Sequence, residues 1–201
     1  QYLFRVLISL PTYKTTNPEI GKILIAEPFL QDPGFKRTVI VITAFESTGI
    51  LGFVLNNPSG IKASDLIPDF ADWTEFDPEL YYGGPVQMET LHFLHRLGEQ
   101  IPDSVKINDN LWWSGDMRVL SELISKGIAN NDNVKFLIGY SGWDAKQLQE
   151  EIKENSWIIA EPKIDLISPV LDRNSYWKTA VKSLGEKYKL YAEFPEDLSW
   201  N

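Results

Sequence analysis

The stretch that decides the fold reads Gly139-Tyr140-Ser141-Gly142-Trp143. An apolar run over residues 134–140 leads into it, and a helical pattern with Leu148 and Ile152 on one face follows it. This is the order of a buried strand, a tight turn and a helix. Because glycine allows close backbone approach and positive φ, the stretch predicts a tightly packed strand end that is covered by a tryptophan.

Strands are predicted wherever β-branched and aromatic residues run between turn residues. These runs lie at 22–26, 38–44, 50–56, 91–95, 111–113, 134–140 and 157–160. The turn Ser47-Thr48-Gly49 indicates a hairpin between the second run and the third. Residues 56–60 are expected to end a strand, and residues 101–110 to form a polar connection.

Three helices are predicted. Asp116 and Asp144 can cap the first turns of two of them, and the third is expected over residues 172–184. Gln147 would complete a capping box with Asp144. Helices and strands interleave without strict βαβ alternation, so the sequence predicts a mixed sheet in a single α/β or α+β domain. We assign residues 21–201 to this domain and residues 1–20 to an N-terminal extension.

The composition is that of one folded domain. A chain of 201 residues with 43% hydrophobic content can bury a full core without crosslinks. It has no cysteine, which excludes disulfides, thiolate metal ligands and cysteine nucleophiles and is consistent with a cytoplasmic protein. No apolar run reaches the roughly 18 residues of a membrane helix, so no membrane association is expected.

The charge balance disfavours direct contact with nucleic acid. The net charge is −9, from 28 acidic and 19 basic residues, and most non-specific affinity for DNA comes from basic groups. The only dense basic candidates are Lys178, Lys182, Lys187 and Lys189, which are typical of a solvated helix face. We therefore expect no sequence-specific binding to duplex DNA.

The motifs, taken in order, resemble those of the AlgH/YqgE family of bacterial proteins. The resemblance covers residues 21–184 and rests on five segments, at 21–28, 52–58, 83–86, 93–95 and 139–157. It implies a bent, bifurcated mixed sheet that closes into a pseudo-barrel. It also implies a role in regulating transcription, without an established biochemical activity, a cofactor or a helix-turn-helix.

The chain departs from the family pattern at two polar positions. Members often carry Glu-His where this chain has Ala44-Phe45, and Arg or Lys where it has Asn57. Those polar groups are missing here, which weakens any interpretation as an enzyme that depends on them.

Few residues could support catalysis or bind a metal. His92 and His95 are the only histidines, and on a strand this spacing places them on opposite faces, so no shared metal site is expected. Ser141 lies in a near match to Gly-x-Ser-x-Gly, but Trp143 occupies the final glycine position. His95 is expected to hydrogen-bond backbone near the Gly83-Gly84 turn.

Two further patterns have a simpler interpretation than ligand binding. Gly83-Gly84-Pro85 lacks the spacing of a phosphate loop and favours a tight turn, although its backbone amides could bind an anion. The acidic run over residues 65–79 does not match a calcium-binding loop and favours a solvated connection.

The glycine motifs predict where a binding site would form. The strand ends around Asn56, Gly83-Gly84 and residues 140–143 are expected to meet around one surface depression, because binding residues gather on loops held by a rigid sheet. The candidate binding residues are Asn56, Gly83, Gly84, His95, Tyr140, Gly142 and Trp143. The competing interpretation is that all of them only pack the core.

Three hypotheses of function follow. The first is a non-enzymatic cytoplasmic protein that acts through a protein or small-molecule partner and affects gene expression indirectly. The alternative is a hydrolase-type enzyme with a pocket near Asn56, Gly84, His95 and Tyr140. The third, direct binding to DNA, is disfavoured by the charge. No catalytic residue, cofactor or metal is assigned.

Overall fold

The protein is described from a computed structural model, in which residues 16–46, 49–67 and 76–195 are described. The first 15 residues of the expected N-terminal extension, the turn residues 47–48 and most of the acidic run lie outside the described residues.

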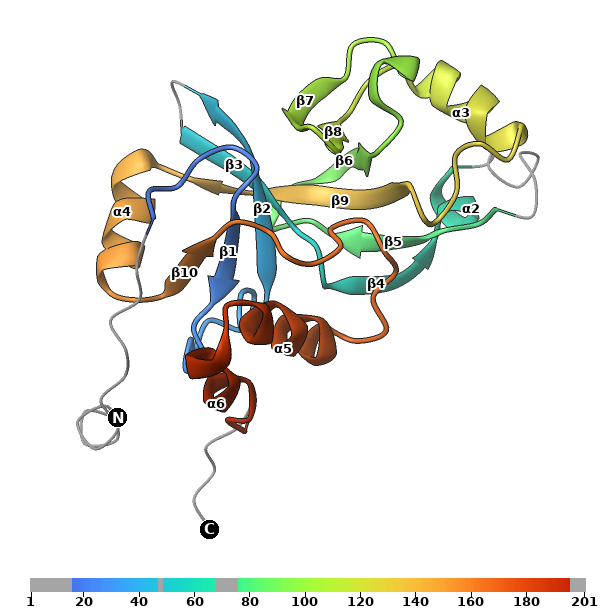
Figure 1. The fold of residues 1–201 in the computed structure, drawn as a ribbon. Helices are drawn as coiled ribbons and strands as arrows, with labels where there is room; N and C mark the ends of the chain where they lie inside the picture. The colour runs from blue at the N-terminus through green and yellow to red at the C-terminus, as the bar shows by residue number, and fades with distance from the viewer. Residues whose placement is uncertain (1–15, 47–48, 68–75, 196–201) are drawn as a thin grey trace.

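Ten strands form one sheet (Figure 1). Along its main path the order is β10 (Trp157–Ala160), β1 (Ile23–Ala26), β2 (Val39–Glu46), β3 (Gly49–Val54), β9 (Val134–Trp143), β6 (Val86–His95), β8 (Leu111–Trp113) and β7 (Val105–Asn108). Two further strands, β4 (Pro58–Lys62) and β5 (Glu79–Tyr82), pair with each other, and β5 also joins β9.

The sheet divides at β9, which crosses the whole molecule (Figure 1). The first half of β9 pairs with β6 antiparallel and with β5 parallel, so that Tyr81 lies beside Leu137. Its last residues pair with β3 instead, with Leu51 beside Gly142. The bifurcated, mixed sheet is thus confirmed. The expected closure into a pseudo-barrel is not formed, since the path of described strands ends at β10 on one side and at β7 on the other.

The three predicted helices are confirmed as α3 (Met117–Ser125), α4 (Ala145–Lys153) and α5 (Arg173–Ser183). Asp116, Asp144 and Asp172 cap them by accepting hydrogen bonds from backbone N–H groups of the first turns. Gln147 donates to the Glu151 carboxylate rather than completing a capping box. Two four-residue helices, α2 (Ala63–Leu66) and α6 (Lys189–Ala192), were not predicted.

Strand β3 ends at Val54, which confirms the predicted strand end, but a further strand follows it, and the expected polar connection at residues 101–110 is wrong. Strand β4 begins within residues 56–60 and β7 lies within residues 101–110. Both strands are short and Ile107 is their only buried residue, so neither has the apolar alternation by which a strand is recognised in a sequence.

Two hydrophobic clusters lie on the two faces of β9. The larger one, which contains Leu137, joins the sheet to α5 and α6, and the smaller one, which contains Phe136, joins it to α3. Successive side chains of a strand point to opposite faces, so one strand contributes to both clusters. The run over residues 134–140 is apolar throughout, apart from Lys135, because both faces are covered.

Candidate functional site

The glycine turns meet as predicted. A Cβ added at Gly84 would lie 2.2 Å from the carbonyl carbon of Tyr140, and one added at Gly83 would lie 2.4 Å from the carbonyl oxygen of Gly139. The Ser141 hydroxyl donates to the Gly83 carbonyl at 3.1 Å. The turn between β5 and β6 therefore packs directly on the middle of β9. Whether these residues bind a partner stays a prediction.

Asn56 does not face a surface depression. Its side chain is fully buried, and its amide donates to the carbonyls of Arg37 at 2.9 Å and Arg173 at 2.8 Å. Its Oδ1 accepts from the backbone N–H of Val39 at 2.8 Å. Asn56 thus ties the start of β2 to the start of α5, which is a structural role.

We expect Asn56→Ala to lower the free energy of unfolding by about 2–4 kcal/mol, because it leaves one buried N–H and two buried carbonyls without these partners. Urea denaturation measures the change. The exposed Asn17, replaced by Ala, is the control and should stay within about 0.5 kcal/mol of wild type. Equal stability of the two variants would restore Asn56 as a candidate binding residue.

The expectation that His95 bonds near Gly83-Gly84 is wrong. His95 is fully buried, and its Nε2 lies 3.0 Å from the Ser104 hydroxyl and 3.1 Å from the Ser114 carbonyl. Its Nδ1 accepts from the Leu97 N–H at 3.3 Å, which assigns the ring proton to Nε2. Burial lowers the pKa of His95, so the ring is neutral.

The remaining predicted residues separate into buried and exposed positions. Trp143 is buried, and its indole N–H donates to the Glu151 carboxylate, which also accepts from the indole of Trp157. Tyr140 is half-buried with its ring 6.1 Å from the His92 ring, and Gly142 is exposed. A shared site of Asn56, His95 and Tyr140 is therefore not formed.

The geometry offers nothing for the hydrolase alternative. The Ser141 hydroxyl is directed to a carbonyl, His92 bonds Thr90, and His95 bonds Ser104. No hydrogen bond joins Ser141 to either histidine among the described residues. A serine nucleophile needs a base within hydrogen-bond reach.

A site that the sequence analysis missed lies at Lys135, on β9. Its side chain is buried, with only 2% of its surface exposed. The Nζ donates to the Leu55 carbonyl at 3.0 Å and lies 3.9 Å from the centre of the Tyr81 ring. One feature of the sequence could have identified this site: Lys135 is the only charged residue in the apolar run over residues 134–140. Charged side chains are almost never fully buried unless they are paired.

The environment of Lys135 disfavours its charge. Burial lowers the pKa of Lys135 to about 7, and the negative charges of Asp165 and Glu79 oppose the shift only in part. No carboxylate lies within 4.0 Å of the amine in the described ranges. At neutral pH the amine is therefore divided between its charged and neutral forms.

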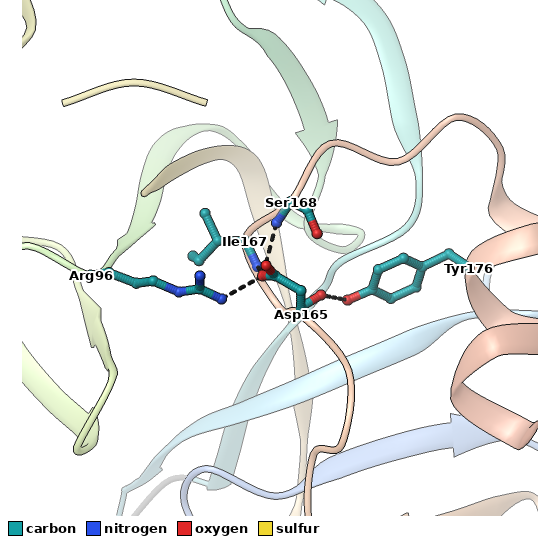
Figure 2. Close-up of polar contacts among 5 residues, drawn as sticks. All are labelled: Arg96, Asp165, Ile167, Ser168 and Tyr176. Carbon is teal, nitrogen blue, oxygen red and sulfur yellow. Dashed lines mark hydrogen bonds and ion pairs between the residues drawn. The ribbon is translucent and has the colours of Figure 1, made fainter. Parts of the chain in front are cut away.

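Two tyrosines frame the lysine. The hydroxyl of Tyr81 accepts from the Val170 N–H at 2.9 Å, and the hydroxyl of Tyr176 donates to the Asp165 carbonyl at 2.6 Å (Figure 2). Burial raises the pKa of both tyrosines, so both remain neutral. Their rings face the amine as neutral π-systems, which stabilise a cation more weakly than a carboxylate would.

A strap, which we define as residues 161–172, joins β10 to α5 (Figure 1). Its residues Ile167 and Val170 line the same cavity as Lys135. Figure 2 shows the Asp165 carboxylate at its centre, which accepts from Arg96 and from the backbone N–H groups of Ile167 and Ser168. Burial alone would raise the pKa of Asp165, but these hydrogen bonds and the Arg96 charge lower it. The strap is thus fixed to the residue that follows β6.

A cavity of about 270 Å³ lies between the strap, β5 and the start of β9. The strap contributes four apolar residues to its lining, and the charged residues of the lining come from β4, β5, β9 and the segment before β5. The lining residues are Lys62, Asp77, Pro78, Glu79, Tyr81, Asn131, Val134, Lys135, Ile167, Pro169, Val170 and Leu171. None of the candidate residues from the sequence analysis is among them.

The open, bifurcated mixed sheet and the helices that pack on it place this protein in the α/β class. Residues 23–189 match the family described as AlgH-like, and the chain belongs to this family. It is 41% identical over 187 residues to a UPF0301 protein from Parabacteroides distasonis, covering 92% of this chain and 93% of the relative. It is 38% identical over 177 residues to a UPF0301 protein from Chlorobium limicola, covering 88% and 92%.

Two solved structures share the fold. The AlgH protein from Pseudomonas aeruginosa aligns with a TM-score of 0.62 at 27% identity, over 90% of this chain and 98% of that one. Protein DIP2367 from Corynebacterium diphtheriae aligns with a TM-score of 0.74 at 19% identity, over 92% and 97%. In the described ranges, no helix is both long and apolar enough to cross a bilayer.

Proposed function

We propose that this AlgH-like protein is a non-enzymatic, cytoplasmic binding protein that acts through a small-molecule or protein partner and affects gene expression indirectly. The observation that supports the proposal is the cavity at Lys135. A buried lysine that lines a cavity and has a lowered pKa is typical of functional sites, since burying a charge without a carboxylate partner destabilises the fold.

Binding is favoured over catalysis because the cavity contains no second group that could work with the amine. The Asp77 carboxylate accepts from both the N–H and the hydroxyl of Ser64, and the Glu79 carboxylate accepts from the Gly60 N–H. Both acids are thus directed to β4 and α2. General acid–base chemistry requires a titratable group within hydrogen-bond reach of the reacting proton.

An indirect effect on expression is favoured by the distribution of positive charge. In the basic segment near the C-terminus, Lys182 pairs with Glu193 and Lys189 pairs with Glu186. These pairs neutralise two of the four lysines in the dense basic group of a chain whose net charge is −9. A protein that contacts DNA directly needs a basic stripe that remains free for phosphate.

We expect a small molecule to copurify with the wild-type protein and to be absent when Lys135 is replaced. The protein is purified from its native host without a tag and denatured, and the released molecules are identified by mass spectrometry. Lys135→Met removes the amine, and Lys163→Met, an exposed change on the strap, is the control. A molecule retained by wild type and the control but absent from Lys135→Met supports the proposal. Identical extracts from all three proteins contradict it.

A further inference from the structure

We propose that the cavity at Lys135 binds a small monocarboxylate, an organic acid with one carboxylate and a short apolar tail. This inference rests on the proposed function and names the chemical class of its ligand. Three features of the cavity carry it: the state of the amine, the charges at the edge, and the size and polarity of the walls.

The amine lacks the acceptors that an ammonium group uses. An ammonium has three N–H donors, and the described residues give Lys135 a single hydrogen bond, to the Leu55 carbonyl. The neighbouring rings of Tyr81 and Tyr176, at 3.9 and 5.9 Å, accept none of them as a carboxylate would. A ligand carboxylate would supply the missing partner through a charge-assisted hydrogen bond.

The charges around the amine limit the ligand to one negative charge. Asp165 on the strap and Glu79 on β5 both act on Lys135 electrostatically, and Asp77 also lines the cavity. Lys62 at the exposed edge is the only other cation in the lining. A phosphate dianion would add a second negative charge beside these carboxylates, and like charges disfavour ionisation.

The walls indicate a short apolar tail. The volume of about 270 Å³ is below the roughly 300–1,000 Å³ of sites for drug-sized ligands. Val134, Ile167 and Val170 are buried apolar residues of the lining, and the exposed Leu171 extends this surface outward. An aliphatic or aromatic tail of a few carbon atoms would contact these residues while the carboxylate reached the amine.

Binding should depend on pH through the amine. A carboxylate binds the protonated form of Lys135, whose pKa is about 7 in the free protein. Below that pH the amine is charged and affinity is constant. Above it, the dissociation constant should rise about tenfold per pH unit until the pH reaches the raised pKa of the complex.

The experiment titrates the full chain with butyrate and benzoate and follows binding by calorimetry or by chemical-shift changes. Butyramide and benzamide are the matched neutral probes, and inorganic phosphate tests the limit on charge. We expect saturable binding of at least one carboxylate, with affinity at least about tenfold lower for its amide and for phosphate. Lys135→Met should abolish the binding, whereas Lys163→Met should leave it unchanged.

Three results would overturn the inference: equal binding of an acid and its amide, retention of binding in Lys135→Met, or phosphate binding more tightly than both acids. The proposed function fails separately. A copurifying molecule of another class, lost with Lys135, would retain the binding protein and reject the monocarboxylate. Saturable carboxylate binding at Lys135 without any copurifying molecule would retain the site chemistry and reject a small molecule as the partner in the proposed function.

Discussion

Lys135→Met should stabilise the folded protein at pH 7, although it removes a hydrogen bond. The pKa of Lys135 falls from 10.5 to about 7 on folding. One pKa unit corresponds to about 1.4 kcal/mol, so the charged amine destabilises the fold by on the order of 5 kcal/mol relative to the neutral one. Methionine fills a similar volume without a charge. Allowing for the lost contact with Leu55, we expect a net gain of about 1–4 kcal/mol.

The pH dependence gives this prediction a second test. Below pH 7 the amine is protonated in both the folded and the unfolded state, so the full destabilisation is present. Between pH 7 and 10.5 the unfolded chain holds the proton that the folded protein has lost, so wild-type stability gains from rising pH. Lys135→Met has no amine at this position, so its stability does not gain from rising pH in this way. The difference between the two proteins should therefore be largest below pH 7 and shrink as the pH rises.

Urea denaturation of both proteins between pH 6 and pH 10 measures the difference. Lys163→Met serves as the control for a change of net charge, because Lys163 is exposed. It should differ from wild type by no more than about 0.5 kcal/mol at every pH. If Lys135→Met were less stable than wild type at pH 6, the bonds of the amine to Leu55 and Tyr81 would outweigh the burial of its charge.

The helices and strands that the sequence predicted well are those that are marked by residues within or next to the element itself. The three long helices begin at aspartates that the chain marks directly, and the buried strands are apolar over consecutive residues. The short strands β4 and β7 were missed because their stability comes from pairing with distant segments, such as Pro58 with Tyr81. Pairing across such distances leaves little trace in local composition.

The sequence predicted the contact between the glycine turns, but not the directions of the Asn56 and His95 side chains. Glycine indicated that the turns would meet, since close approach requires the absence of Cβ. It did not indicate the direction of Asn56, which is decided by Arg37 and Arg173, far away in the sequence. Lys135 was overlooked for a related reason. The apolar run that contains it predicted a strand, and the single charge within it was not considered separately.

Gly84→Ala should be the most damaging single substitution in the glycine turns. A Cβ at Gly84 would lie 2.2 Å from both the carbonyl carbon and the carbonyl oxygen of Tyr140, and 2.3 Å from the backbone nitrogen of Ser141. All three atoms belong to the backbone of β9, so no side-chain rotation relieves the overlap. The turn would have to withdraw from β9, together with the hydrogen bonds from Gly83 N–H to Ile138 and from Val54 N–H to Gly83.

The expected loss is at least about 3–4 kcal/mol of unfolding free energy, since overpacking against a fixed backbone and the loss of buried hydrogen bonds act together. Gly142→Ala is the matched control on the same strand. There the nearest atom to an added Cβ is a ring carbon of Tyr140 at 3.5 Å, an ordinary contact. Thermal or urea unfolding of the two variants compares them directly. A Gly84→Ala protein as stable as Gly142→Ala would mean that the turn does not pack on β9. The contact that holds the β5–β6 turn against β9, where the sheet divides, would then lie elsewhere.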